Sequence, residues 1–336
     1  MITLKDIAKE AGVSMMTVSR VINKRYSEVS PGTVEKVEKV IQKMNYVPNS
    51  SARSLSSRFS RIISVIINGT NNPLESYYNA AMLGGIIQAV QEHGYNTMVH
   101  FTDEYTEVTK HLQSWKSEGA IFLGLFEKDI CSIQNGNDIP LIFTDSYSRS
   151  RQLNNIGLND YKGGQLAAQH LIRNGHRCMA FVSEFIDSTK ITSHVMVERL
   201  KGFQETIKAE GLSFTEQQVF CITDLSSTVH NIIASPLHIT GLFAGSDALA
   251  RQLISELYRH GYSVPENYSV IGFDDFAESQ FGTPTLTTIH QDVQKKARCC
   301  VDLLFRHLEE PDLPAQNQVI DVSLIERESV RDLTRH

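Results

Sequence analysis

The chain has 336 residues, of which 41% are hydrophobic and 21% charged, and this indicates two or three folded domains rather than one core. No apolar run approaches the ~18 residues of a membrane span, and the N-terminus enters an amphipathic pattern without a signal peptide. The five cysteines are odd in number and lack a CxxC spacing, which argues against a disulfide framework or a zinc site. They predict the reducing cytoplasm, with no metal or cofactor.

The formal net charge of −6 is distributed unevenly. Residues 1–61 hold eleven basic and five acidic side chains, a net charge of +6, whereas the remaining 275 residues carry −12. A basic segment on an acidic body is typical of a DNA-binding module joined to a part that does not bind DNA. The alternative is a chance fluctuation of charge in a short segment.

Helical spacing dominates the first sixty residues. Apolar residues recur over 4–11 and again over 15–22, with Gly12 at the break and Ser14 as a good N-cap of the second helix. A helix, a short turn with glycine and a second helix form a helix-turn-helix. A third helix is predicted after Ser30, with Ser30 as its cap and proline at its first position.

The second helix is expected to lie in the major groove with its N-terminal residues on base edges. Thr17, Ser19 and Asn23 suit phosphate oxygens, and Arg20 suits a bidentate contact with guanine.

Two adjacent methionines, Met15 and Met16, stand at the tip of this second helix. They cannot read a hydrogen-bond code but can pack on thymine methyl groups, which predicts A·T pairs facing them. The alternative is that they staple the start of the helix onto the rest of the headpiece.

From Arg61 onward, short apolar runs alternate with helix-length stretches. Strands are expected at 62–67, 97–101, 120–123, 141–143, 178–182, 241–244 and 269–273, and helices at 78–93, 106–118, 161–174, 194–210 and 247–260. Such alternation predicts doubly wound parallel sheets, and its two successive sets predict two similar lobes with a ligand at the carboxyl ends of the strands.

Several sequence motifs resemble the LacI/GalR family of bacterial repressors. They include residues 3–8, 11–14, 17–23 and 46–49 in the headpiece, and 169–182, 271–275, 285–292 and 324–329 in the body. The resemblance covers nearly the whole chain. It implies an all-α helix-turn-helix headpiece followed by an α/β core of two lobes like that of periplasmic binding proteins.

The resemblance also implies domain limits. It gives a headpiece of residues 1–47, a hinge helix and linker of 48–61, and chain crossings near 158–161, 289–292 and 319–322. One sensing lobe then holds 62–160 with 292–320, and the other holds 161–291 with 321–336.

The serine-rich segment 49–57 matches the family's hinge helix, which orders when two subunits sit on the operator. Leu55 matches the leucine that wedges into the minor groove, with Ala52 beside it and Asn49 at the start. The alternative is a plain flexible linker, because this segment has little apolar surface. The loop 24–28 is about one residue longer than in some members, which alters the expected phosphate contacts there. The full set of residues expected to contact DNA is Thr3, Ser14, Met15, Met16, Thr17, Ser19, Arg20, Asn23, Ser30, Thr33, Tyr46, Asn49, Ala52 and Leu55.

An effector site is expected between the lobes. By resemblance it takes Asp145 from the first lobe and Arg199, Ser246 and Asp274 from the second, although Ser246 stands where many relatives have asparagine. Carboxylates and a guanidinium at strand ends suit a polyhydroxylated ligand, while Arg199 leaves room for an anionic one. The alternative for the aspartates is capping of loops and helices.

Tyr77 and Tyr78 mark the largest departure from the family, because the loop before them is a few residues longer. They stand where an aromatic pair often closes over the effector. Tyr78 is expected at the ligand, and stacking on a sugar face or merely starting a helix are equally compatible with the sequence.

Two other classes of function are weaker. A periplasmic solute-binding protein shares the sensing fold but does not account for the basic helix-turn-helix. An enzyme would need a catalytic motif, and the pair Asp274 and Asp275, the histidines His170 and His176, and the adjacent Cys299 and Cys300 do not form one. The expected protein is a homodimeric, sugar-controlled repressor on a palindromic operator.

Overall fold

The computed structural model describes residues 2–22, 24–46, 60–69, 71–124, 130, 133–134, 136–146, 153–184 and 193–334. The chain divides into two compact units, Met1–Ser60 and Arg61–His336. Among the described residues, no helix is both long and apolar enough to cross a bilayer.

The first unit is a small bundle of helices. Its elements are α1 (Leu4–Ala11), α2 (Met15–Ile22), the 3₁₀ helix η1 (Tyr26–Glu28) and α3 (Pro31–Lys43). Ile7, Ala11, Val18 and Val37 are fully buried and form its core. The helix-turn-helix expected from the apolar spacing is confirmed.

Short polar side chains set the ends of these helices. Thr3 and Asp6 form a capping box on α1, and Gly12 ends that helix at φ +60°, a conformation that glycine adopts without strain. Ser14 accepts a hydrogen bond from the backbone N–H of Thr17, as expected of a cap. Ser30 differs from expectation: its hydroxyl pairs with that of Thr33 at 2.8 Å and makes no bond to the helix backbone.

The second unit contains two sheets. The first holds β1 (Ile62–Asn68), β2 (Asn96–Thr102), β3 (Gly119–Leu123), β4 (Leu141–Thr144), β5 (Asn155–Leu158) and β11 (Asn317–Ile320), in the order β11-β5-β4-β3-β1-β2. All its strand pairs are parallel, with Ile63 opposite Thr97 and Gly119.

The second sheet repeats this arrangement. It holds β6 (Met179–Ser183), β7 (Val219–Cys221), β8 (Gly241–Ala244), β9 (Ser269–Asp274), β10 (Thr287–His290) and β12 (Ser323–Ile325), in the order β12-β10-β9-β8-β6-β7. The strands are parallel except for the edge pair of β10 and β12, which is antiparallel.

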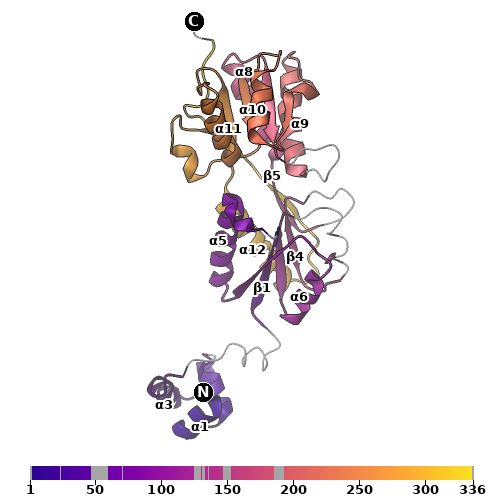
Figure 1. Cartoon of the computed structure of the whole chain (residues 1–336). Helices are drawn as coiled ribbons and strands as arrows, with labels where there is room; N and C mark the ends of the chain where they lie inside the picture. The colour runs from indigo at the N-terminus through magenta and orange to yellow at the C-terminus, as the bar shows by residue number, and fades with distance from the viewer. Residues whose placement is uncertain are drawn as a thin grey trace. The chain divides into compact units, whose positions relative to one another are not determined.

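Helices cover both faces of each sheet (Figure 1). The helices are α5 (Tyr77–Glu92), α6 (Val108–Ser114) and α12 (Val293–Glu309) around the first sheet, and α8 (Asp160–Arg173), α9 (His194–Ala209), α10 (Leu225–Ile233) and α11 (Asp247–Arg259) around the second. Alternate residues of a strand face opposite sides, so α5 and α12 share one core with the first sheet while α6 packs on its other face. In the second sheet, α8 and α9 lie opposite α10 and α11. The doubly wound α/β architecture is confirmed.

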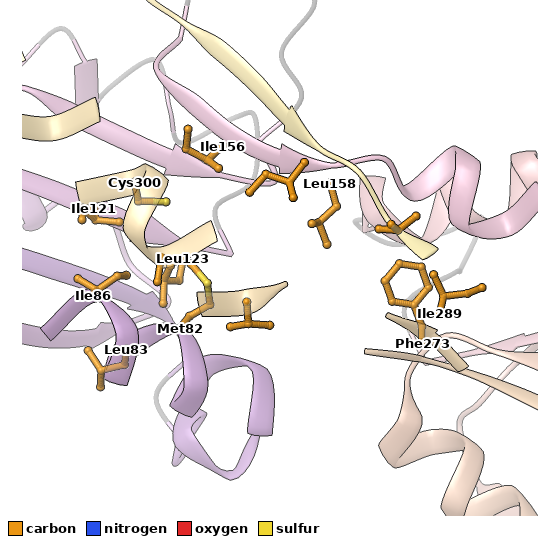
Figure 2. Packing of buried hydrophobic residues seen from close by; sticks show 14 of the residues in the cluster. Met82, Leu83, Ile86, Ile121, Leu123, Ile156, Leu158, Phe273, Ile289 and Cys300 are labelled. Atoms are coloured by element: carbon orange, nitrogen blue, oxygen red, sulfur yellow. The ribbon is translucent and has the colours of Figure 1, made fainter. Parts of the chain in front are cut away.

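The chain passes between the sheets after β5, after β10 and after β11, since β11 belongs to the first sheet and β12 to the second. One hydrophobic cluster continues across these crossings. Figure 2 shows Met82 and Ile86 of α5 on one side, Phe273 and Ile289 of the second sheet on the other, and Leu158 between them.

The elements that the sequence predicted begin and end within two residues of the expected positions, except α6. The structure adds β5, β7, α10, β10, α12, β11 and β12, which were not predicted. Helix α6 covers Val108–Ser114 rather than 106–118, and Lys116 adopts a positive φ of +52° just after it. A short 3₁₀ helix, η2 (Pro73–Glu75), precedes α5 where the sequence predicted only a long loop. Ser76 then caps α5 by accepting from the N–H of Asn79.

Candidate DNA-binding and effector sites

The start of α2 is exposed. Met15 and Met16 are 55% and 64% exposed, and neither packs against the headpiece core, so the stapling role receives no support. The hydroxyls of Ser14 and Thr17 lie 2.9 Å apart at the same end of the helix. This end therefore presents two apolar and two hydroxyl side chains to solvent.

The other predicted DNA contacts have varied surroundings. Thr3 donates to Asp6 within its capping box, and Tyr46 is half-buried against the headpiece core. Arg20 pairs with Glu28, its Nε lying 2.9 Å from Oε2. Asn23, Asn49, Ala52 and Leu55 lie outside the described residues, as does the predicted hinge helix.

Three aspartates at strand ends have left-handed backbone angles. Asp145 follows β4 at φ +53°, Asp274 ends β9 at φ +131°, and Asp275 follows at φ +61°. Non-glycine residues rarely adopt these angles, and such strain costs about 1–3 kcal/mol per residue and clusters at functional sites. The strained positions lie at the carboxyl ends of strands, where α/β sheets bind ligands.

Asp145 is held by a buried lysine that the sequence analysis did not identify. Nζ of Lys296 on α12 lies 2.6 Å from both carboxylate oxygens of Asp145 and 2.8 Å from the hydroxyl of Tyr78. That hydroxyl in turn donates to Asp145 at 2.9 Å. The Lys296 side chain is 0% exposed. The negative charge of Asp145 is therefore neutralised and its orientation is set from two helices.

Arg199 on α9 is the centre of a second buried group. Its Nε donates to Asp160 at 2.8 Å and its Nη1 donates to the carbonyl of Gly245 at 2.6 Å. The guanidinium also lies over the ring of Phe273, 3.3 Å from the ring centroid. Burial raises the pKa of Asp160, Arg199 opposes that rise, and the charge of Asp145 adds to it. The charge of Asp145 thus acts on the ion pair of Asp160 and Arg199, so these two buried clusters lie close together.

Asp274 lies beside this second group. Its Oδ1 accepts from Nε2 of Gln291 at 2.5 Å, and Gln291 stands in the crossing after β10. Burial raises the pKa of Asp274 to about 7, although Arg199 opposes the rise. Oε1 of Gln291 is buried without a hydrogen-bond partner among the described residues. An unpaired buried acceptor is costly, so this atom is suited to a donor from outside the chain.

Ser246 and Asp247 cap and brace the second lobe. Ser246 accepts from the N–H of Leu249 at the start of α11. Asp247 accepts from the N–H of Asp275 at 2.8 Å and from the hydroxyls of Ser279 and Thr288. The carboxylate of Asp275 pairs with His290 and Arg327, whereas that of Asp274 accepts from Gln291. The two adjacent aspartates, 274 and 275, therefore have separate partners and do not act as a carboxylate pair.

Tyr77 and Tyr78 differ in role. Tyr78 is directed to Asp145, whereas Tyr77 is 53% exposed and its ring lies 6.4 Å from that of Phe276 in the second lobe. Of the predicted aromatic pair, Tyr77 thus lies at a contact between the lobes, while Tyr78, the residue expected at the ligand, is bonded to Asp145.

The histidines considered as metal ligands have other partners. His176 bonds to Thr240 at 2.9 Å and to the carbonyl of Arg331, and burial lowers its pKa to about 4. His170 is buried, with Glu326 3.6 Å away. Within the described part of the chain, no three His, Cys, Asp or Glu side chains form a group able to hold a metal ion.

The raised pKa of Asp274 has a consequence for pH dependence. Because the folded-state pKa of about 7 exceeds the ordinary value of 3.8, the folded chain retains a proton that the unfolded chain loses. Asp274 therefore contributes stability below about pH 4, and this contribution is lost as pH rises toward and through 7. We expect Asp274→Asn to remove this part of the dependence of the free energy of unfolding on pH.

The measurement is the free energy of unfolding of both proteins at several values between pH 4 and 8. Taking the difference between them removes the opposite slope that His176, with its lowered pKa, contributes to both. A constant difference across that range would contradict the protonation of Asp274.

Comparison with known proteins agrees with this arrangement. Residues 3–49 match the model of the bacterial regulatory proteins of the lacI family, and residues 168–330 match the periplasmic binding protein-like domain. The HTH-type transcriptional repressor PurR of Aliivibrio fischeri (strain MJ11) is 30% identical, over 98% of each chain. The chain belongs to the LacI family.

Further relatives of this LacI-family chain support the same assignment. The ribose operon repressor of Escherichia coli (strain K12) is 30% identical over 98% of this chain and 100% of its own. The structure of a lac repressor dimer bound to operator and the anti-inducer ONPF superposes with a TM-score of 0.86 at 25% identity, covering 98% and 99% of the two chains. The resemblance noted in the sequence is confirmed, and the chain is a DNA-binding transcriptional regulator. These relatives are repressors rather than enzymes, and a solute-binding protein is not favoured.

Proposed function

We propose that this LacI-family regulator represses transcription as a homodimer, with two headpieces on a palindromic operator in the cytoplasm. The observation that carries the proposal is the exposed start of α2, within residues 1–61 that together carry a net charge of +6. A related repressor was crystallised as a dimer on its operator. In this scheme residues 48–61 link the headpiece to lobes of 62–160 with 292–320 and of 161–291 with 321–336.

We assign the effector to a site formed by Asp145, Ser246 and Asp274, at or just after the ends of their strands, and by Arg199 of α9, with Tyr78 bonded to Asp145. Oδ1 of Asp145 keeps a lone pair besides the one bonded to Lys296, and Oε1 of Gln291 has no partner among the described residues. Both can accept hydrogen bonds, so they suit a ligand rich in hydroxyl or N–H donors. The name of the ribose operon repressor supports a sugar or sugar derivative as the ligand class. We assign the chain no catalytic step.

Control of DNA binding follows from the position of this site between the lobes. A ligand that binds one relative orientation of the lobes more tightly shifts the population toward it, with a typical coupling of ~1–3 kcal/mol. The linkers of the two subunits then favour or disfavour the paired headpieces on DNA.

The test is selection of tight binders from a random duplex DNA pool by the full-length protein, without added small molecule, at near-physiological salt. We expect enrichment of a palindrome with a deformable central step, which then serves to screen sugars for release of DNA. If no sequence is enriched, the selection is repeated with cell metabolites present to supply a corepressor. Failure to enrich any sequence in both selections would contradict the proposal.

The two methionines provide a test of base recognition. We expect Met15→Ala and Met16→Ala to weaken the preference for A·T at the facing base pairs, each by about fivefold, because contact with thymine methyl groups is lost. Repeating the selection with each variant measures this preference. An unchanged base profile would show that the methionines do not read DNA.

Two exposed aromatic residues provide a test of dimerisation. Phe281 is 68% and Tyr258 76% exposed, and Arg251 of α11 joins their elements by donating to the carbonyls of Ser279 and Pro284. Large exposed aromatics are typical of protein interfaces. We expect Phe281→Asp to shift the protein toward monomer in sedimentation and to lower operator affinity at least tenfold.

The control for Phe281→Asp is Asn231→Asp, which introduces the same charge at an exposed polar residue of α10 in the same lobe. It should leave both the sedimentation and the operator affinity unchanged. A variant Phe281→Asp that remains dimeric would place the interface elsewhere.

A further inference from the structure

Arg20 of the second headpiece helix is held by an acidic residue outside the predicted DNA-binding set. Its Nε lies 2.9 Å from Oε2 of Glu28, and the other carboxylate oxygen lies 3.9 Å from Arg25. A guanidinium has five N–H groups in a planar fork. With Nε beside Glu28, the four N–H groups on the two terminal nitrogens have no partner among the described residues and suit a bidentate contact.

The position of Glu28 is itself well determined. The chain turns after α2, where Lys24 adopts a φ of +56° and the N–H of Arg25 donates to the carbonyl of Arg20 at 2.9 Å. Tyr26 donates to Glu38 of α3 at 3.1 Å, and Val29 packs against the headpiece core. The backbone of Glu28 is thus held to the headpiece on both sides, and this places its carboxylate beside Arg20.

The ion pair contributes little to stability, because the two side chains are 38% and 42% exposed and such surface pairs are worth about 0–1 kcal/mol. A carboxylate within the basic segment of residues 1–61, of net charge +6, also opposes the approach of phosphates. Its presence beside the base-reading helix is therefore better explained by an effect on Arg20 than by stability or by affinity for DNA.

We propose that Glu28 determines sequence specificity by orienting the guanidinium of Arg20 toward one base pair in each half-site. Glu28 is a positioning residue and contacts no base itself. This inference rests on the proposed operator binding. Glu28 limits the rotamers of Arg20 before DNA binds. The arginine then distinguishes guanine from the other bases rather than moving to a nearby phosphate.

The experiment uses the full-length protein and the palindrome that the wild type selects from the random pool. Affinities of wild type, Arg20→Ala, Glu28→Ala and Glu28→Gln are measured for that duplex and for each single base-pair change in a half-site. We expect Arg20→Ala to lose its preference at one base pair, and Glu28→Ala to lose at least about fivefold of the same preference. The preferences at all other positions should stay as in the wild type.

Glu35→Ala is the matched control, since Glu35 pairs with Lys39 on α3 and its loss changes the headpiece charge by the same amount. It should raise affinity for all duplexes alike, with the base profile unchanged. Glu28 variants that behave as Glu35→Ala does would overturn the proposal, as would an Arg20→Ala profile with no position-specific loss. Failure of the wild type to select any sequence would instead contradict the proposed function, and it would be seen before any variant is tested.

Discussion

Replacement of Lys296 by methionine should destabilise the sensing core by about 3–5 kcal/mol, because it removes one partner of a buried ion pair. The lysine is fully buried, and the carboxylate of Asp145 would lose its counter-charge and two hydrogen bonds. The single tryptophan, Trp115, lies just after α6 in the first lobe. Its fluorescence during urea unfolding therefore reports the unfolding of the lobe that contains Lys296.

Two further variants separate the ion pair from the packing of α12. Lys295→Met changes the neighbouring exposed lysine and should alter the free energy of unfolding by no more than about 0.5 kcal/mol. The double variant Lys296→Met with Asp145→Asn should recover much of the loss, because no unpaired charge is left. If the double variant were as unstable as Lys296→Met alone, the loss would come from packing and not from charge.

Lys296 also illustrates why the effector site was only partly predictable. The family resemblance supplied Asp145, Arg199 and Asp274, and the alternation of strands and helices placed the two aspartates at the carboxyl ends of strands. Lys296 is 151 residues from Asp145, and an ion pair between distant positions leaves no local signal. One signal was available: Lys296 occupies the apolar stripe of α12 with Val293, Ala297 and Cys300.

The fold was more accessible to sequence reasoning, since period and apolar runs report directly on helices and buried strands. The remaining errors have physical causes. Ser30 precedes α3 as expected, but Thr33 competes for its hydroxyl. The predicted α6 was too long because the polar residues after Ser114 continue the pattern, whereas the chain turns at Lys116.

The close crossing of α8 and α9 leads to the second large effect. The two helices are in contact through Gly164 and Gly202, and a Cβ built on Gly202 would lie 1.9 Å from the carbonyl oxygen of Tyr161. A Cβ on Gly164 would lie 2.0 Å from the carbonyl oxygen of Arg199. Both obstacles are backbone atoms, so no side-chain rotation can relieve the clash and the helices must move apart.

We therefore expect Gly202→Ala to destabilise the sensing core by about 3 kcal/mol or more, at or above the upper end of the usual cost of overpacking. Gly84→Ala is the control, because Gly84 lies within α5 and a Cβ there meets nothing within 4 Å. It should stabilise by about 0.5–1 kcal/mol, since alanine is the better helix former. Urea unfolding followed by far-ultraviolet circular dichroism compares the two variants.

The same crossing has a consequence for the effector site. Arg199 belongs to α9 and Asp160 begins α8, so separating the helices lengthens the ion pair that joins them. In the surviving folded fraction, Gly202→Ala should weaken the response of operator binding to the sugar found by the screen, while operator affinity without sugar changes little. A variant that is stable and responds normally would show that the glycines do not set the helix separation. The position of Arg199 in the site would then not depend on the crossing of α8 and α9.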